Sequence, residues 1–200
     1  PELTETLHAA VGFPRVLNMD GSEPHERRHL PNPLSYPLWS LSTVLPKFGR
    51  GRRKTSEYVV VRSGSGASML LRPGLIDQIG LMDETFFLYM EDTDFFKRVL
   101  DHGFRMIRGQ SFVVRHVGGE SSSMYGKSAI HRQAMIARGI YFDKHYGRRG
   151  LAAYLCWMLP ESVAVSVIRA VKYRRIGVLR EIPEMAGLAW KMSTVVSVNV

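Results

Sequence analysis

Apolar and polar residues follow one another in short blocks that predict strands and helices. The expected strands are apolar runs bounded by turn residues, at 12–17, 59–61, 67–72, 104–107 and 111–117. The expected helices carry apolar residues every three or four positions, at 75–79, from about 92 to 102, and at 127–145. Gly80, Gly103 and Gly147 mark where these helices should end.

The pattern becomes helical and basic toward the C-terminus. The apolar run Leu151–Leu159, which Pro160 is expected to end, is shorter than the ~20 residues that cross a bilayer. Residues 161–180 combine apolar positions with a basic group, Lys172, Arg174, Arg175 and Arg180, as in a helix that lies on an anionic membrane surface. An amphipathic helix packed on its own domain explains the same pattern at least as well, and both interpretations stay open.

Composition narrows the class of protein. The 200 residues include 27 Lys and Arg against 18 Asp and Glu, a net charge of +9 that suits nucleic acid, an anionic membrane or a phosphorylated substrate. No nucleic-acid-binding motif is present, so we expect no nucleic acid partner. The single Cys156 excludes an intrachain disulfide framework. Residues 1–10 do not resemble a secretory signal, and we expect sequence to be missing before Pro1.

The segment Asp83–Asp94 holds five carboxylates around an aromatic and apolar stretch. It lacks the spacing and the central glycine of a calcium-binding EF-hand loop. Asp92, at the expected start of a helix, has two interpretations with about equal support. It caps the helix by accepting hydrogen bonds from backbone N–H groups, or it is a rigidly held general base.

His116 is the second candidate, because it closes an expected strand and is followed by Gly118 and Gly119. Glycines let a ligand approach the backbone, and a neutral imidazole at a strand end is a good ligand for a divalent metal. Taken alone, a histidine that is only hydrogen-bonded at a strand edge is the better-supported interpretation.

Several segments, in order, resemble family-2 glycosyltransferases of the bacterial rhamnosyltransferase type. They are residues 66–72 (GASMLLR), 79–94 (IGLMDETFFLYMEDTD), 103–121 and 141–147 (YFDKHYG). Together they span roughly residues 57–150. The resemblance implies an α/β fold of the GT-A type, a Rossmann-like sandwich. It also implies a nucleotide-sugar donor, Mg²⁺ or Mn²⁺, and inversion of the anomeric centre in one displacement.

The resemblance assigns roles to individual residues. Asp92 corresponds to the general base, and His116 to the residue that approaches the metal. Gly66 and Ala67 border the cleft between donor and acceptor, and Glu91 orients the acceptor. Asp94, in contrast, is expected only to anchor the start of the helix.

One element of the family is absent. Its nucleotide-binding strands and its Asp-x-Asp metal motif precede the matched region, and neither Asp20 nor Glu23 reproduces that motif. We therefore expect an acceptor-side GT-A portion at residues 1–147 and a helical, membrane-associated extension at 148–200. Without those carboxylates the chain alone is expected to be catalytically weak unless upstream sequence or another polypeptide completes it.

The resulting functional hypothesis is an enzyme of cell-wall polysaccharide biosynthesis in the cytoplasm, at the inner face of the cell membrane. It would transfer a sugar, with rhamnose as the candidate, from a nucleotide-sugar donor to a glycan or polyprenyl-linked acceptor. The alternative is a non-catalytic remnant of such an enzyme that serves as a binding or membrane-associated module.

Overall fold

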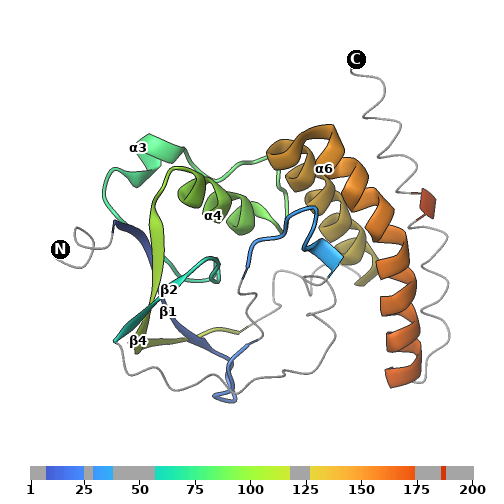
Figure 1. Ribbon diagram of the computed structural model, residues 1–200. Coiled ribbons are helices and arrows are strands. Elements are labelled where there is room, and N and C mark those ends of the chain that lie inside the picture. Colours follow the sequence, from blue (N-terminus) through green and yellow to red (C-terminus); the bar gives the residue numbers. More distant parts are fainter. Residues whose placement is uncertain (1–7, 25–28, 38–56, 118–126, 174–185, 188–200) are drawn as a thin grey trace. The chain divides into compact units, whose positions relative to one another are not determined.

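The computed structural model describes residues 8–24, 29–37, 57–117, 127–173 and 186–187 of this α/β protein (Figure 1). Its contacts divide the chain into two units. The sheet unit comprises Pro1–Leu30 and Lys47–Met124, and the helical unit comprises Pro31–Pro46 and Tyr125–Val200. This division differs from the expected one at residue 147, because residues 31–37 and 127–146 pack with the C-terminal helix.

The sheet unit contains a four-stranded mixed sheet in the order β2-β4-β1-β3. Its strands are β1 (Ala9–Leu17), β2 (Tyr58–Val61), β3 (Leu70–Leu71) and β4 (Arg105–Arg115). The central strands β1 and β4 run parallel, whereas β2 and β3 pair with them in the antiparallel direction. Only two residues of the expected strand 67–72 join the sheet, and both of their side chains are exposed.

Strand β4 corrects the prediction of two short strands at 104–107 and 111–117. It is one strand of 11 residues, but its pairing with β1 is irregular in the middle. Phe13 lies opposite Arg108, and the next pair is Arg15 with Val113, so β4 contains extra residues between these points. The sequence break around Gly109 therefore marks an irregularity inside one strand.

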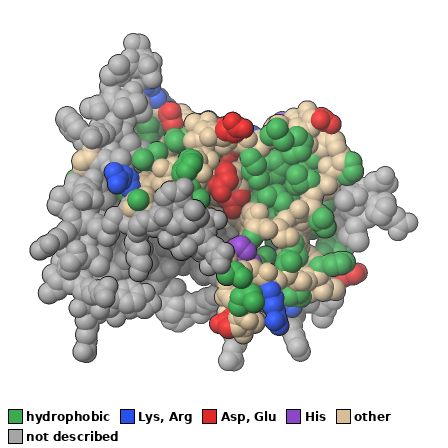
Figure 2. Space-filling view, turned by 180° about the vertical axis from the view of Figure 1, so that it is seen from behind, with side chains coloured by type: hydrophobic (Ala, Val, Ile, Leu, Met, Phe, Trp, Pro, Cys, Tyr) green, Lys and Arg blue, Asp and Glu red, His purple; other side chains and the backbone are tan. Residues whose placement is uncertain are grey.

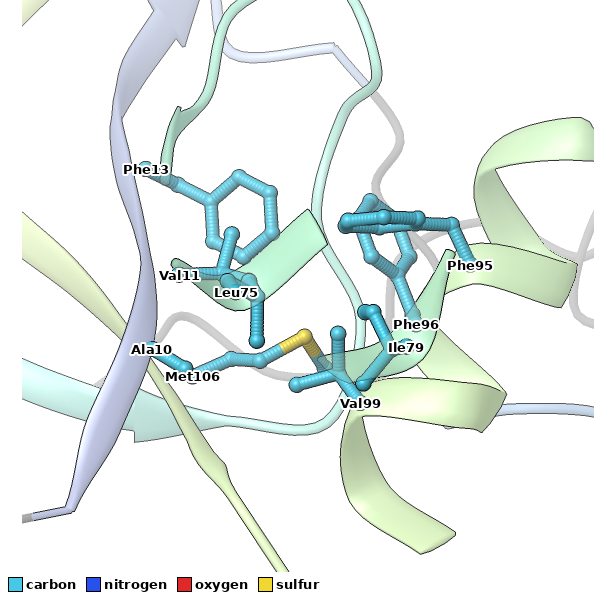
Figure 3. Packing of buried hydrophobic residues seen from close by; sticks show 9 residues of the cluster. All are labelled: Ala10, Val11, Phe13, Leu75, Ile79, Phe95, Phe96, Val99 and Met106. Atoms are coloured by element: carbon cyan, nitrogen blue, oxygen red, sulfur yellow. The ribbon is translucent and has the colours of Figure 1, made fainter. Parts of the chain in front are cut away.

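Two helices accompany the sheet, α3 (Leu75–Ile79) and α4 (Glu91–Asp101). Both end at the predicted glycines, since Gly80 and Gly103 each have a φ of 80°, a left-handed conformation that favours glycine. The buried face of α4 packs against the sheet (Figure 3). The core is formed by Ala10, Val11, Phe13, Leu75, Ile79, Phe95, Phe96, Val99 and Met106. This packing fixes the position of the first turn of α4, where the acidic residues lie.

The helical unit is dominated by α6 (Lys127–Tyr173), which breaks at Gly147, where φ is 62° and ψ is −166°. The predicted end of a helix at Gly147 is confirmed as this break. The two halves of α6 then pack side by side: the Tyr154 hydroxyl donates to the Met135 carbonyl at 3.0 Å. The prediction that Pro160 ends the apolar helix is wrong, because α6 continues through Pro160 and buries Met158 and Ser162 on either side of it.

Aromatic side chains form the core of the helical unit. Phe142 and Tyr154 stack with ring centroids 5.4 Å apart, and Tyr36 meets both rings edge-on from residues 31–37. The Tyr36 hydroxyl donates to Glu161 Oε2 at 2.6 Å, and burial raises the pKa of this phenol. No helix among the described residues is both long and apolar enough to cross a membrane.

Candidate functional site

The carboxylates of the acidic segment gather around the start of α4, where the backbone is strained. The helix begins at Glu91, and the two preceding residues, Tyr89 and Met90, have φ values of 69° and 70°. Side chains larger than glycine rarely adopt this left-handed conformation, which costs on the order of 1–3 kcal/mol per residue and persists where the surroundings enforce it. Such strain is enriched at functional sites, and no glycine or asparagine signalled it in the sequence.

The structure places Gly66 close to Asp92. A Cβ atom placed on Gly66 would lie 3.0 Å from Asp92 Cβ and 3.2 Å from Asp92 Oδ2. Both distances are shorter than ordinary van der Waals contact. Ala67 follows in the same exposed turn, where its N–H donates to Ser65 Oγ at 3.3 Å. Glycine at 66 therefore lets this turn approach the carboxylate closely.

Asp92 itself is half-buried and lies within the first turn of α4 rather than at the capping position, which Met90 occupies. Its Oδ1 accepts a hydrogen bond from the Thr93 N–H at 2.6 Å and lies 3.1 Å from the Thr93 hydroxyl. The carboxylate thus accepts a hydrogen bond from one N–H group of the first turn, as the capping interpretation expects, although Asp92 is not the capping residue. The second oxygen, Oδ2, faces Gly66.

Glu91 has an unusual environment for a carboxylate. Its Oε2 atom is buried and has no hydrogen-bond partner among the described residues. Burial raises the pKa of Glu91, and the neighbouring negative charge of Asp92 raises it further. A buried oxygen without a partner destabilises the fold, so this position is better suited to receiving a ligand than to holding the helix.

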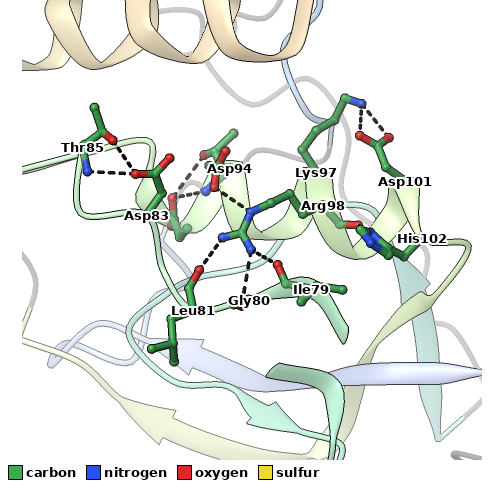
Figure 4. Close-up of polar contacts among 12 residues, drawn as sticks. Ile79, Gly80, Leu81, Asp83, Thr85, Asp94, Lys97, Arg98, Asp101 and His102 are labelled. Carbon is green, nitrogen blue, oxygen red and sulfur yellow. Dashed lines mark hydrogen bonds and ion pairs between the residues drawn. The ribbon is translucent and has the colours of Figure 1, made fainter. Parts of the chain in front are cut away.

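Asp94 is the structural carboxylate of the group, in agreement with its expected role (Figure 4). It is fully buried and pairs with Arg98 Nε at 2.9 Å, one turn along α4. The Arg98 guanidinium also donates to the carbonyls of Ile79, Gly80 and Leu81, the last at 2.8 Å. Arg98 thereby connects α4 to residues 79–81, which lead into the segment Asp83–Asp94.

The loop before α4 presents apolar side chains beside these acids. Asp83 closes it with a short turn, accepting hydrogen bonds from the N–H and hydroxyl of Thr85. Phe87 is 70% exposed, and Leu81 and Met82 are exposed as well. The space-filling view shows acidic and hydrophobic side chains next to one another on one face (Figure 2). A ligand that has both hydroxyl groups and apolar surface could contact the acidic and the hydrophobic side chains together.

His116 lies in the same unit, directly after the last residue of β4. Its N–H donates to the Leu17 carbonyl at 2.9 Å, so it sits where the parallel strands β1 and β4 both reach their carboxyl ends. Its side chain is exposed. The carboxyl ends of parallel strands are common ligand sites in α/β folds. No described contact joins His116 to Asp92.

A complete metal site is not assembled by the residues described. Within them, no group of three His, Cys, Asp or Glu side chains could hold a metal ion. Asp20 and Glu23 are engaged elsewhere: Asp20 accepts from the N–H and hydroxyl of Ser22, and Glu23 pairs with Arg15 at 2.7 Å. The hydrogen bonds from Ser22 lower the pKa of Asp20. His116 alone does not fit a resident Mg²⁺ or Mn²⁺.

Comparisons with family models, with curated proteins and with solved structures found no match.

Proposed function

We propose that this chain carries the acceptor-side part of an inverting glycosyltransferase and that Asp92 is its general base. The observation that supports this most is the close approach of the Gly66 turn to Asp92, within 3.2 Å of Oδ2 for an added Cβ. The half-buried carboxylate is held in place on α4 by the Thr93 N–H at 2.6 Å, which suits a positioned general base. The GT-A arrangement is part of this proposal for the sheet unit.

In the proposed reaction, Asp92 removes the proton of the acceptor hydroxyl while that oxygen attacks the anomeric carbon of the donor sugar. The new glycosidic bond forms as the bond from the anomeric carbon to the nucleoside diphosphate breaks, and the anomeric configuration inverts. Glu91 positions the acceptor through Oε2, which has no hydrogen-bond partner in the described part of the chain, and Gly66 and Ala67 belong to the neighbouring turn.

The substrates follow from the resemblance. The donor is a nucleotide sugar, with rhamnose as the candidate, and the acceptor is a cell-envelope glycan or a polyprenyl-linked sugar. The exposed apolar residues of the loop before α4 favour the lipid-linked acceptor, since an isoprenoid chain supplies matching apolar surface. We therefore propose the inner face of the cell membrane as the location of the reaction.

Substitution of Asp92 by Asn tests the proposal. Asn keeps the size of the side chain but cannot take up a proton, so release of nucleoside diphosphate should fall by about 10²–10⁴-fold with the melting temperature little changed. Asp101→Asn is the control, because Asp101 is exposed on the same helix and pairs only with Lys97 among the described contacts. Turnover should be measured for the 200 residues and for an upstream-extended version. Retained turnover in a folded Asp92→Asn variant would remove Asp92 from the role of base.

The alternative function is a non-catalytic remnant. It is favoured because no group of three His, Cys, Asp or Glu side chains in the described residues could hold a metal ion. Titration with a nucleoside diphosphate and Mn²⁺ separates the two functions. The transferase proposal predicts metal-dependent nucleotide binding by the upstream-extended protein. Absence of such binding there would support the remnant.

A further inference from the structure

The second half of α6, after the break at Gly147, has two different faces. Its inner face is buried against the first half and contains Leu151, Tyr154, Met158 and Ser162. Its outer face is apolar yet exposed. Trp157 is 46%, Val163 42% and Val167 47% exposed, although side chains of this kind are usually buried.

The exposed residues follow the helical repeat. Cys156, Val163 and Val167 are separated by seven and four residues, which places them on one line along the helix. Trp157 and Leu159 flank this line, and Pro160 lies on it. We name these residues, all exposed, the α6 stripe: Cys156, Trp157, Leu159, Pro160, Val163 and Val167.

The stripe contains no charge. The only ionisable acid or base of the Asp, Glu, Lys and Arg types in residues 151–167 is Glu161. Glu161 is turned inward, because it accepts from the Tyr36 hydroxyl at 2.6 Å and pairs with Arg138 at 3.4 Å. The exposed residues from Cys156 to Val167 therefore form an uncharged, apolar face over about three helical turns at 3.6 residues per turn.

The charge of the protein is concentrated in the same unit. The helical unit has 12 Lys and Arg against 4 Asp and Glu, a formal charge of +8, whereas the sheet unit has 15 against 14. Exposed Arg148 and Arg149 precede the stripe, and Arg149 lies seven residues before Cys156 on the same line. Basic residues also follow the stripe in the sequence, from Arg169 onward. An apolar strip between basic ends suits an anionic lipid surface.

We infer that the α6 stripe binds the surface of an anionic lipid bilayer, with the helix parallel to the membrane plane. Trp157, Val163 and Val167 enter the boundary between headgroups and acyl chains, while Arg148 and Arg149 contact lipid phosphates. A second copy of the chain fits less well, because two units of charge +8 repel one another. This inference does not depend on the proposed transferase activity.

Cys156 provides a direct probe, since it is the only cysteine of the chain and lies exposed in the stripe. An environment-sensitive dye attached to Cys156 is titrated with vesicles of equal parts phosphatidylglycerol and phosphatidylcholine. Its emission should shift to the blue and gain intensity, and the shift should weaken at high salt. Vesicles of phosphatidylcholine alone should bind on the order of tenfold less.

Two substitutions locate the surface. Val163→Glu with Val167→Glu should reduce binding to anionic vesicles on the order of tenfold or more in co-sedimentation. The matched control is Leu34→Glu, because Leu34 is 94% exposed in the same unit but outside the stripe, and this variant should bind normally. Equal binding by both variants, or no dye response to anionic vesicles, would overturn the inference. So would a dimer that the double substitution dissociates, because the stripe would then be an interface between copies.

Discussion

The two units of this protein differ in their unusual structural features, which are internal in the sheet unit and exposed in the helical unit. The sheet unit is nearly neutral, and its unusual features lie together at the start of α4. They are the left-handed backbone of Tyr89 and Met90 and a buried Glu91 oxygen that no described residue hydrogen-bonds. The helical unit has a formal charge of +8, and its unusual feature is the set of exposed apolar side chains in the α6 stripe. Strain around acids suits chemistry, whereas exposed apolar surface suits adhesion. We therefore propose that chemistry belongs to the sheet unit and adhesion to the helical unit.

The largest expected effects come from the two cores. Phe96→Ala in the sheet unit and Phe142→Ala in the helical unit should each reduce the free energy of unfolding by about 3–5 kcal/mol. All three tryptophans belong to the helical unit. In denaturant titrations, Phe142→Ala should shift the transition seen by tryptophan fluorescence, whereas Phe96→Ala should shift only the far-ultraviolet circular dichroism. Equal shifts of the fluorescence transition would show that the units unfold together.

The next effect contrasts two ion pairs on α4, both between residues four apart. Arg98→Met leaves the fully buried Asp94 carboxylate without its cation and should destabilise the sheet unit by about 3 kcal/mol. Lys97→Met removes the exposed pair with Asp101 and should change stability by about 0.5 kcal/mol or less. Chemical denaturation measures both. Similar losses would mean that Arg98 does not anchor the acidic loop.

A smaller effect is expected at the turn above Asp92. Gly66→Ala places a methyl group 3.0 Å from Asp92 Cβ, so the turn or the carboxylate must move by a few tenths of an ångström. We expect turnover to fall about tenfold, equivalent to about 1.4 kcal/mol, with little loss of stability. Gly12→Ala is the control, since its nearest contact would be an ordinary 3.8 Å. Unchanged turnover in Gly66→Ala would separate this turn from the reacting groups.

The smallest effect concerns Glu91 and depends on pH. Because its pKa is raised in the folded protein, the folded state holds more protons than the unfolded state between the two pKa values, and stability falls as pH rises through that range. Glu91→Gln removes the fall in stability that ionisation of Glu91 causes as pH rises. It should stabilise the sheet unit by about 1 kcal/mol or less at pH 7, since the side chain is only half-buried, and by less at pH 4. Thermal melting at both pH values measures the difference, and destabilisation at pH 7 would indicate a structural role.

The sequence predicted local features where glycine or periodicity determines them. The ends of α3 and α4 at Gly80 and Gly103 and the break of α6 at Gly147 are confirmed. Predictions from local sequence were wrong where tertiary packing outweighs a local signal, at Pro160 and around Gly109. Pro160 lies inside α6 because Met158 and Ser162 are buried around it, and Gly109 lies inside β4 because β1 pairs on both sides of it.

The candidate site was predictable only in part. The resemblance assigned Gly66 and Asp92 to one site, and these roles stay predictions, whereas the strain at Tyr89 and Met90 had no sequence signal. The environment of Glu91 could not be foreseen either, because the burial of one oxygen depends on the packing of the whole loop. The metal-binding role of His116 stays a prediction.

The separation of tasks between the units is tested most directly by one double comparison, in which sugar transfer to a soluble acceptor and binding to anionic vesicles are measured on the same two variants. Asp92→Asn should lose transfer and keep vesicle binding, and Val163→Glu with Val167→Glu should lose vesicle binding and keep transfer. If either variant loses both activities while remaining folded, or if each loses the activity assigned to the other unit, the account is contradicted.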